Sequence, residues 1–215
     1  MFPTKRTAAF QPAVARLALT ALFRGPSARE RRAGVESVLP DGTALRGINL
    51  ANGTATVDLS REISGTSGEE ELRLALAQVV YTVTQFRTVK AVRFEFEGRS
   101  IGPRSQTRRI HADLLPAIVV ESPTIGASVS SPVVVKGTAN VFEATVSLRI
   151  LDSQGREIAR TFTTATCGTG CRGRYSKSVR FSVSSEQPGT IQVFEESAEN
   201  GQPINVVRIP VTLRP

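Results

Sequence analysis

The sequence of 215 residues contains few of the residue types on which most catalytic and metal centres depend. It has one His, two Cys, one Met and no Trp. These counts exclude multi-His metal sites, zinc ribbons with their four ligands, and disulfide-dense scaffolds. Long apolar runs are also missing, since no stretch of about 18 apolar residues occurs that would span a membrane as a helix.

The stretch from Ala8 to Phe23 comes nearest to a signal peptide. Gln11, Pro12 and Arg16 interrupt it, however, and a charge inside the apolar region of a signal peptide is unfavourable. We therefore predict a helix of the mature fold here. Any export signal or membrane anchor is expected to lie upstream of Met1 or to be absent.

The remaining composition is that of a folded, basic protein. Hydrophobic residues make up 40% and charged residues 21% of the chain, enough apolar material for a packed core. The net charge is +8, and 23 of the 27 basic residues are Arg. This charge is spread out: residues 1–116 hold 17 basic and 11 acidic residues, and residues 117–215 hold 10 and 8. No RNP or zinc-finger motif accompanies it, so we predict no nucleic-acid binding.

Residues 12–98 show the pattern of an α+β domain. Apolar residues at helical spacing follow Pro12, and Ser27 is placed to cap a second short turn. Asn52-Gly53 predicts a tight hairpin, followed by the alternating strand 54–59.

A longer helix is expected next. Ser67 and Glu70 have the spacing of a capping box, and apolar residues then recur every three or four positions as far as Phe86. Residues 92–96 alternate as a strand. The predicted order is helix, hairpin, helix, strand.

Residues 99–116 have no such periodicity and are predicted to be a basic linker between domains 1–98 and 117–215. Arg99, Arg104, Arg108 and Arg109 lie in it without a nearby acid, so they are candidates for contact with phosphate or carboxylate groups. A solvated, flexible linker is the simpler explanation.

Residues 117–215 contain only short strand-like runs separated by turn signals. Seven such runs in about 100 residues predict a β-sandwich, with Val146, Leu148 and Ile150 in its core. The runs are 118–120, 133–135, 145–151, 157–163, 178–183, 190–194 and 206–213; Asp152 to Gly155, Pro188-Gly189 and Asn200-Gly201 are among the predicted separators.

Several separated motifs of residues 12–98 resemble the GerMN domain, the sporulation and spore germination domain of bacteria. They are Ala21 to Pro26 with Glu30, Ser37 to Pro40 with Gly42, Val57 to Ser60, and Gln78 to Thr82. The order of elements is also similar to the ring-building motif of secretion and sporulation assemblies, in which copies pack side by side. Members usually carry a strand before the first helix, for which this chain has only about eleven residues.

Residues 117–213 resemble the immunoglobulin-like domain that commonly follows GerMN domains in spore germination proteins. The motifs are Val120 to Pro123, Ser131-Pro132 with Gly137, Phe142-Glu143, the Gly155 turn, Val193 to Glu195 and Ile209 to Val211. The resemblance implies an all-β immunoglobulin-like sandwich. Together the two resemblances imply an extracytoplasmic, non-catalytic role in the envelope of a Gram-positive-type bacterium.

Cys167 and Cys171 are the only cysteines and have three interpretations. Gly168 and Gly170 between them allow the chain to double back until the two Cα atoms lie within about 6 Å, as a disulfide requires. A structural disulfide is favoured if the protein is exported. A metal or redox pair and two unpaired thiols are the alternatives, and two sulfurs supply only half of a structural zinc shell.

Other residues that could support catalysis have simpler explanations. His111 lies next to Asp113 in the predicted linker, and a solvated linker histidine is expected there because no recognisable nucleophile motif accompanies it. Glu95 and Glu97 are expected on the solvent face of a strand. We predict no catalytic residue, no cofactor and no metal ligand.

The sequence thus predicts a non-catalytic, extracytoplasmic interaction or assembly module, anchored by a segment upstream of Met1. Its expected partners are envelope proteins or like copies bound through the first domain, with an anionic envelope polymer or lipid as a further candidate. The alternative is a peptidoglycan or envelope-polysaccharide binder. The absence of Trp and the presence of only two Tyr count against that alternative, because sugar sites usually stack on aromatic rings.

Overall fold

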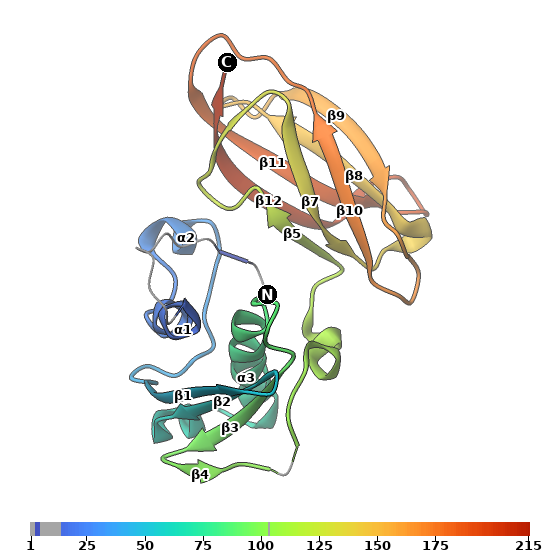
Figure 1. The fold of residues 1–215 in the computed structure, drawn as a ribbon. Coiled ribbons are helices and arrows are strands. Elements are labelled where there is room, and N and C mark those ends of the chain that lie inside the picture. The colour runs from blue at the N-terminus through green and yellow to red at the C-terminus, as the bar shows by residue number, and fades with distance from the viewer. Residues whose placement is uncertain (1–2, 5–13, 103) are drawn as a thin grey trace. The chain divides into compact units, whose positions relative to one another are not determined.

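A computed structural model describes residues 3–4, 14–102 and 104–215 of the chain (Figure 1). It contains two compact units with a boundary between Leu114 and Leu115, and each unit has its own apolar core. The first is an α+β domain and the second is an all-β sandwich. The predicted fold class is therefore confirmed.

The first domain is built around a mixed sheet with the strand order β1-β2-β3-β4. Its elements in chain order are α1 (Val14–Phe23), α2 (Ala28–Arg32), β1 (Leu45–Ala51), β2 (Thr54–Leu59), the 3-10 helix η1 (Arg61–Gly65), α3 (Glu69–Val83), β3 (Ala91–Phe96), β4 (Arg99–Ser100) and the 3-10 helix η2 (Arg108–Leu114). The predicted start of α1 at Pro12 lies outside the described residues.

The β1–β2 hairpin and the β2–α3–β3 crossover form as the sequence predicts. Asn52 and Gly53 have φ values of 50° and 75°, which a tight hairpin of the primed turn types requires. β2 pairs antiparallel with β1 and parallel with β3. α3 provides the long connection that two parallel strands need.

One face of this sheet is buried against the helices. Ala55, Val57 and Leu59 alternate along β2 and are fully buried. The helices supply the opposite side of the core, which includes Leu19 of α1 and Val79 of α3. The apolar face predicted for α3 is thus confirmed.

Helix capping differs from the prediction in one place. α3 begins after Gly68, and no side chain caps it; the backbone N–H of Ser67 instead donates to the carboxylate of Glu71. Ser67 lies one residue too early to act as the cap. A capping box does form at the predicted cap of α2, where the backbone N–H of Ser27 donates to Glu30 Oε2 at 2.7 Å and the Ser27 hydroxyl accepts from the Glu30 N–H at 3.4 Å.

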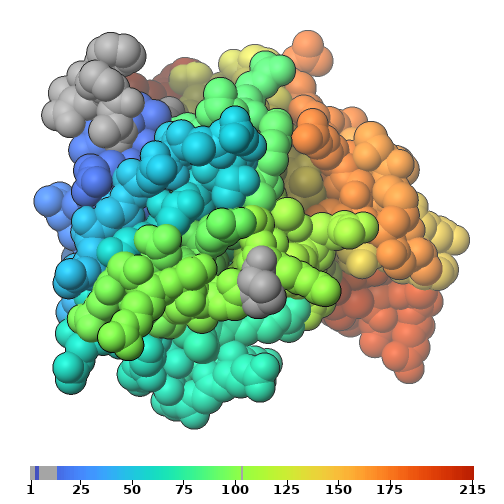
Figure 2. All heavy atoms as spheres, turned by 60° about the horizontal axis from the view of Figure 1, so that its bottom comes forward, coloured from blue at the N-terminus to red at the C-terminus, as the bar shows by residue number. Residues whose placement is uncertain are grey.

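The structure also differs from the expected linker at residues 99–116. β4 pairs with β3, and Gln106 exchanges backbone hydrogen bonds of 2.7 and 2.8 Å with Val92. η2 then packs against α3. The described residues of 99–114 therefore belong to the first domain, and Figure 2 shows them in lime green along its surface. The sequence shows no periodicity here because β4 has only two residues and the 3-10 helix η2 is interrupted at His111.

Two arginines fix η2 on α3. Arg108 donates from Nε to the hydroxyl of Thr84 at 2.8 Å, and its guanidinium lies 5.0 Å from the centre of the Tyr81 ring. From α3, Arg73 donates to Asp113 at 2.6 Å. Arg108 thus has a structural role in the first domain.

His111 is buried, so the expectation of a solvated histidine was wrong. Only 2% of its surface is exposed, and its Nε2 lies 2.7 Å from Gln106 Oε1. Its Nδ1 is buried with no hydrogen-bond partner among the described residues. Burial, together with the nearby charge of Arg73, lowers the pKa of His111, while Asp113 opposes this shift.

The second domain consists of strands that form two sheets. The strands are β5 (Ile118–Ser122), β6 (Ser128–Ser130), β7 (Val133–Ala139), β8 (Thr145–Leu151), β9 (Glu157–Thr164), β10 (Gly173–Val179), β11 (Gln187–Glu196) and β12 (Pro203–Arg214), with a 3-10 turn η3 (Phe142–Ala144) before β8. One sheet has the order β10-β7-β5 and the other β6-β12-β11-β8-β9.

The core of the sandwich lies between these sheets. Val146, Leu148 and Ile150 are fully buried in it, as predicted, and pack in one cluster with Val135 of the smaller sheet. Each sheet therefore contributes one apolar face, as a sandwich requires.

Some strand positions differ from the prediction. β10 occupies residues 173–179 instead of 178–183, because Gly173 and the half-buried Lys177 interrupt the apolar residues of its inward row and conceal the alternation. β6 was not predicted. Pro188 and Gly189 lie within β11 rather than between strands, and a Cβ atom at Gly189 would come within 2.4 Å of the Leu213 side chain.

A buried tyrosine crosses the smaller sheet above a glycine. The Tyr175 hydroxyl donates to the carbonyl oxygen of Val119 at 3.2 Å, and only 4% of Tyr175 is exposed. A Cβ atom at Gly137 would lie 1.9 Å from that oxygen and 2.8 Å from the hydroxyl. Gly137 is therefore required for this contact. Burial raises the pKa of Tyr175 well above its ordinary value.

We expect Tyr175→Phe to lower the free energy of unfolding of the second domain by about 1 to 2 kcal/mol, because it removes a buried hydrogen bond. Gly137→Ala should cost more, since the strand must shift to admit the Cβ atom. Urea unfolding followed by circular dichroism measures both. Ser176→Ala on the same strand is the control, because Ser176 is exposed and its hydroxyl has no partner among the described residues; its expected loss is below about 0.5 kcal/mol. A Tyr175→Phe loss no larger than that of the control would contradict the prediction.

We expect acid to loosen η2. The folded state holds His111 neutral, whereas the unfolded chain protonates it below about pH 6.5, so the stabilisation is present above that pH and is lost as the pH falls. Asp113 stays charged at about pH 5, because Arg73 holds the pKa of that carboxyl below its usual range.

Hydrogen exchange at residues 106–113, corrected for intrinsic rates, measures this effect. Protection should be lower at about pH 5 than at about pH 7.5. In His111→Gln, which has no titrating group at this position, the difference should disappear. Equal protection at both pH values in the unmodified chain would disprove the prediction.

Candidate functional site

The first domain leaves one face of its sheet uncovered. The side chains opposite the buried row of β2 belong to Thr54, Thr56 and Asp58, and the strand register places Arg93 beside Thr56 and Glu95 beside Asp58. These positions are partly or fully exposed. We call Thr54, Thr56, Asp58, Arg93 and Glu95 the open sheet face. It is polar and lies next to β1, an edge strand whose Leu50 is 52% exposed.

The four predicted contact arginines separate into two kinds. Arg108 is used to hold η2 on α3. Arg99, Arg104 and Arg109 are exposed, and their side chains have no partner among the described residues. The structure thus leaves three of the four available for an external anion.

Sequence reasoning passed over a second group of arginines around α2. Arg24, Arg29, Arg31 and Arg32 lie within nine residues and are all exposed. The one acid among them, Glu30, is 6% exposed because the capping box holds its carboxylate against Ser27. The signal in the sequence was the run from Ala28 to Arg32. The sequence does not show that this run has an excess of positive charge at the surface, because that depends on the burial of Glu30.

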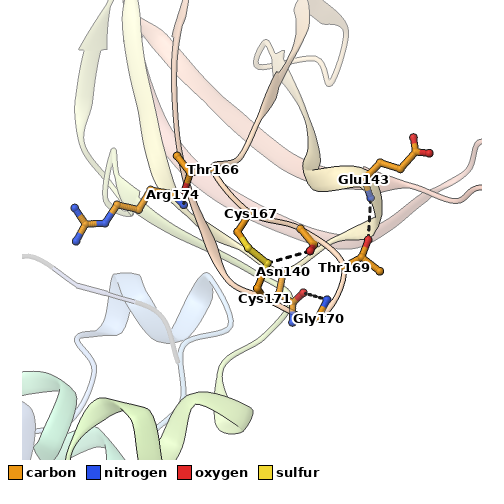
Figure 3. The surroundings of a disulfide bond; sticks show 9 residues. Asn140, Glu143, Thr166, Cys167, Thr169, Gly170, Cys171 and Arg174 are labelled. Atoms are coloured by element: carbon orange, nitrogen blue, oxygen red, sulfur yellow. Dashed lines mark hydrogen bonds between the residues drawn. A yellow bond between two sulfur atoms is a disulfide. The ribbon is translucent and has the colours of Figure 1, made fainter.

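Cys167 and Cys171 are joined by a disulfide, with their Cα atoms 5.7 Å apart (Figure 3). The loop that they close packs against the segment before β8. The N–H of Gly170 donates to Asn140 Oδ1 at 3.0 Å, and the hydroxyl of Thr169 accepts from the N–H of Glu143 at 3.2 Å. The disulfide therefore supports a neighbouring loop as well as its own.

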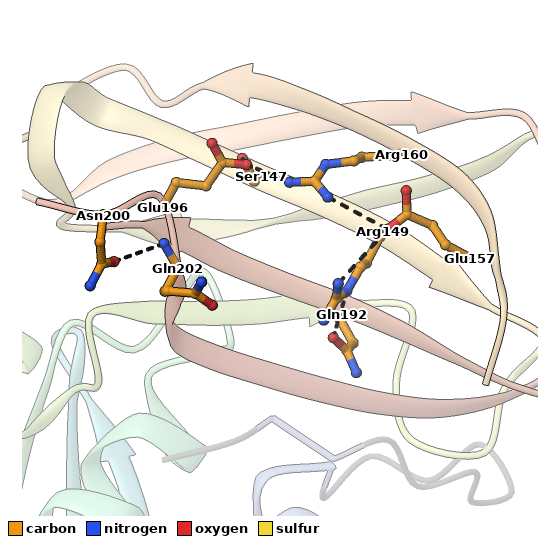
Figure 4. Close-up of polar contacts among 8 residues, drawn as sticks. All are labelled: Ser147, Arg149, Glu157, Arg160, Gln192, Glu196, Asn200 and Gln202. Atoms are coloured by element: carbon orange, nitrogen blue, oxygen red, sulfur yellow. Dashed lines mark hydrogen bonds and ion pairs between the residues drawn. The ribbon is translucent and has the colours of Figure 1, made fainter. Parts of the chain in front are cut away.

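The outer face of the larger sheet carries a network of paired charges (Figure 4). Arg160 donates to Glu196 at 2.8 Å, and Arg149 donates to Gln192 at 2.8 Å. Both guanidinium groups lie over the ring of Phe194, at 5.7 and 5.3 Å from its centre, and Phe194 is fully buried beneath them. Arg149 and Arg160 are thus occupied by partners within the domain.

The residues considered for catalysis or metal binding have defined surroundings in the structure. No group of three or more His, Cys, Asp or Glu side chains that could hold a metal ion occurs among the described residues. His111 is enclosed between Gln106 and the Arg73–Asp113 pair. Glu95 and Glu97 do not share a strand face as expected, because β3 ends at Phe96 and Glu97 adopts a left-handed turn conformation with φ of 51°.

No helix within the described part of the chain is long and apolar enough to cross a membrane. A shallow hollow lies beside the β1–β2 turn, where Leu50, Gly53 and Val89 contribute to its lining. It contains no ionisable side chain.

Comparison with protein families assigns both domains. Residues 2–102 match the family described as sporulation and spore germination. Residues 117–202 match the family described as the immunoglobulin-like domain of bacterial spore germination. The comparison with curated protein sequences finds no match to this chain.

Solved structures similar to the chain include two from Bacillus subtilis and one from Clostridium perfringens. The first GerMN domain of the sporulation protein GerM from Bacillus subtilis is 23% identical, with a TM-score of 0.42 over 48% of this chain and 85% of that one. The tandem GerMN domains of the same protein are 16% identical, with a TM-score of 0.42 over 96% of this chain and 53% of that one. A protein from Clostridium perfringens described as a candidate lipoprotein is 18% identical, with a TM-score of 0.40 over 45% and 68%.

The family matches coincide with the two folded domains, since one ends at residue 102 and the other begins at residue 117, on either side of the observed boundary. The α+β architecture of the first domain and the sandwich of the second agree with the predicted resemblances. The chain therefore contains a sporulation and spore germination (GerMN) domain within residues 2–102 and an immunoglobulin-like domain of bacterial spore germination within residues 117–202.

Proposed function

We propose that the chain is a non-catalytic module that acts outside the cytoplasm and assembles or contacts structures of the bacterial cell envelope during sporulation or germination. One observation carries this proposal: both domains belong to sporulation and germination families, and neither family consists of known enzymes. A chain made of two such domains is suited to joining other components.

The non-catalytic part of the proposal is supported by the surroundings of the ionisable side chains. His111 is buried and Arg108 is engaged in the fold. The carboxylates near them serve ion pairs, such as that of Asp113 with Arg73. General acid and base catalysis needs such groups to be accessible to a substrate.

The first domain supplies the proposed contact surface. Its open sheet face is polar, exposed and extended, and lies beside an edge strand with unpaired backbone groups. The resemblance to the ring-building motif implies that like domains pack side by side. We therefore propose that this face binds a second GerMN-type domain or another envelope protein, with Arg99, Arg104 and Arg109 available to an anionic polymer or lipid.

The disulfide supports a location outside the cytoplasm. Structural disulfides form and persist in oxidising compartments and are rare in the cytosol. Cys167 and Cys171 are both consumed by the bridge. We propose that the protein is exported and held at the membrane by a segment upstream of Met1.

Protein matured outside the cytoplasm should contain no free thiol. Titration with a thiol reagent under denaturing conditions should therefore show none before reduction and two after it, since the chain has two cysteines. The same protein treated with reductant is the control. Two reactive thiols before reduction would refute the bridge and remove this support for export.

The contact surface is tested by charge reversal in the parent bacterium. Arg93→Glu changes the centre of the open sheet face, and the Arg93 side chain has no partner among the described residues. We expect it to reduce the yield of germination-competent spores toward that of a deletion strain. Arg87→Glu, an exposed arginine in the turn after α3, is the matched control and should behave as the unmodified chain.

Both variants are first compared with the unmodified protein by thermal unfolding, to show that they fold equally well. Equal spore phenotypes for Arg93→Glu and the unmodified chain would argue against this surface. The polysaccharide alternative is tested with purified cell wall, where saturable binding that soluble sugar fragments compete away would favour it over the protein-interaction role.

A further inference from the structure

The disulfide end of the sandwich presents two exposed apolar side chains on a rigid backbone. They are Phe142, which is 52% exposed, and Ile204, which is 42% exposed. We call residues 140–144 and 196–205, with the supporting loop 167–171, the disulfide tip. Exposed apolar side chains within a polar surround are typical of protein contact sites.

A buried carboxylate anchors both positions. Glu195 is 8% exposed, and its Oε1 accepts from the backbone N–H of Phe142 at 2.7 Å. Its Oε2 accepts from the side-chain amide of Asn205 at 2.7 Å, next to Ile204. Hydrogen bonds to an ionised group are stronger than those between neutral groups, so Glu195 fixes the two segments relative to each other.

The backbone around Phe142 is held in an unusual conformation. Glu143 and Ala144 have φ values of 51° and 58°, and two successive non-glycine residues in this region are rare. The disulfide loop packs directly on them, since a Cβ atom at Gly168 would lie 2.3 Å from the backbone nitrogen of Ala144. Such conformations persist only where the surroundings enforce them, and they occur often at binding sites.

The charge of the tip is opposite to that of the chain. Its exposed acids without a side-chain partner among the described residues are Glu143 and Glu199, since Glu196 pairs with Arg160, and the segments 140–144 and 196–205 contain no basic residue. The chain as a whole has a net charge of +8, with the larger share of the excess in residues 1–116. An acidic, apolar surface on a basic protein is complementary to the protein itself.

We propose that the disulfide tip binds the arginine group at α2 of a second copy of this chain. Arg24, Arg29, Arg31 and Arg32 offer four exposed guanidinium groups, and the one acid among them is buried in its capping box. Phe142 and Ile204 provide the apolar centre of the contact, and the tip acids pair with the arginines around it.

Because the tip and the arginine group are different surfaces, the contact is head-to-tail and extends from copy to copy. This inference rests on the proposed interaction role but uses a surface other than the open sheet face. The two can therefore fail separately: the Arg93→Glu experiment tests the open sheet face in cells, and the association of the purified chain tests the tip.

Sedimentation velocity of the full chain tests the proposal. We expect reversible association between about 10 µM and about 500 µM at low salt, and weaker association at about 500 mM NaCl, where screening shortens the range of charge interactions. Phe142→Ser should weaken association about tenfold, as removal of a central aromatic contact does. Phe162→Ser removes an equally exposed phenylalanine from the outer face of the larger sheet and should have no effect.

Two charge-reversal variants test the direction of the contact. Glu143→Lys with Glu199→Lys alters the tip, and Arg29→Glu with Arg32→Glu alters the arginine group; none of these four side chains has a partner among the described residues. Each variant alone should be monomeric. An equal mixture should associate again, because the intact arginine group of the first variant meets the intact tip of the second, and the two altered surfaces also carry opposite charges.

Three results would overturn the proposal. The first is a chain that stays monomeric at every concentration. The second is a mixture of the two variants that remains monomeric although the unmodified chain associates. The third is a change of hydrodynamic radius in the tip variants without any dependence on concentration, which would mean that the tip is occupied by the first domain of its own chain.

Discussion

The need to bury one apolar face of each sheet governs the whole molecule. In the first domain, the alternation along β2 leaves Ala55, Val57 and Leu59 on one side, and α1 and α3 must cover them. In the second domain, two sheets bury their apolar faces against each other. Burial of this kind is the main favourable contribution to folding. The opposite faces of the sheets are left polar, which makes them available for contact or for internal ion pairs.

Polar contacts then fix the segments that the apolar cores do not reach. η2 is attached to α3 by Arg73 and Arg108, and the chain around Phe142 is attached to Glu195 and the disulfide loop. These contacts have different consequences. The first group extends the first domain to Leu114 and encloses His111, whereas the second holds Phe142 outward in a defined position. Both depend on side chains that are distant in sequence from the residues they hold.

Regular periodicity allowed much of the fold to be predicted. The hairpin at Asn52-Gly53, the buried face of α3 and the core strand with Leu148 follow from residues close together in the chain. The errors fall where local patterns are weak. β10 is rich in Ser and basic residues, and residues 99–114 are ordered by single contacts to β3 and α3. The role of Glu195 could not be predicted, since its two partners lie at positions 142 and 205.

Alternation, turn residues and composition are local properties, and they were enough to predict the two-domain architecture, the family resemblance and the scarcity of residues suited to catalysis. The burial of His111, the structural role of Arg108 and the withdrawal of Glu30 from the arginines around it became known only from the folded chain. It also decided that Phe142 and Ile204 share one anchor. The physical reason is that exposure and charge at a surface depend on which distant segments meet, and that is set by packing rather than by neighbours in the chain.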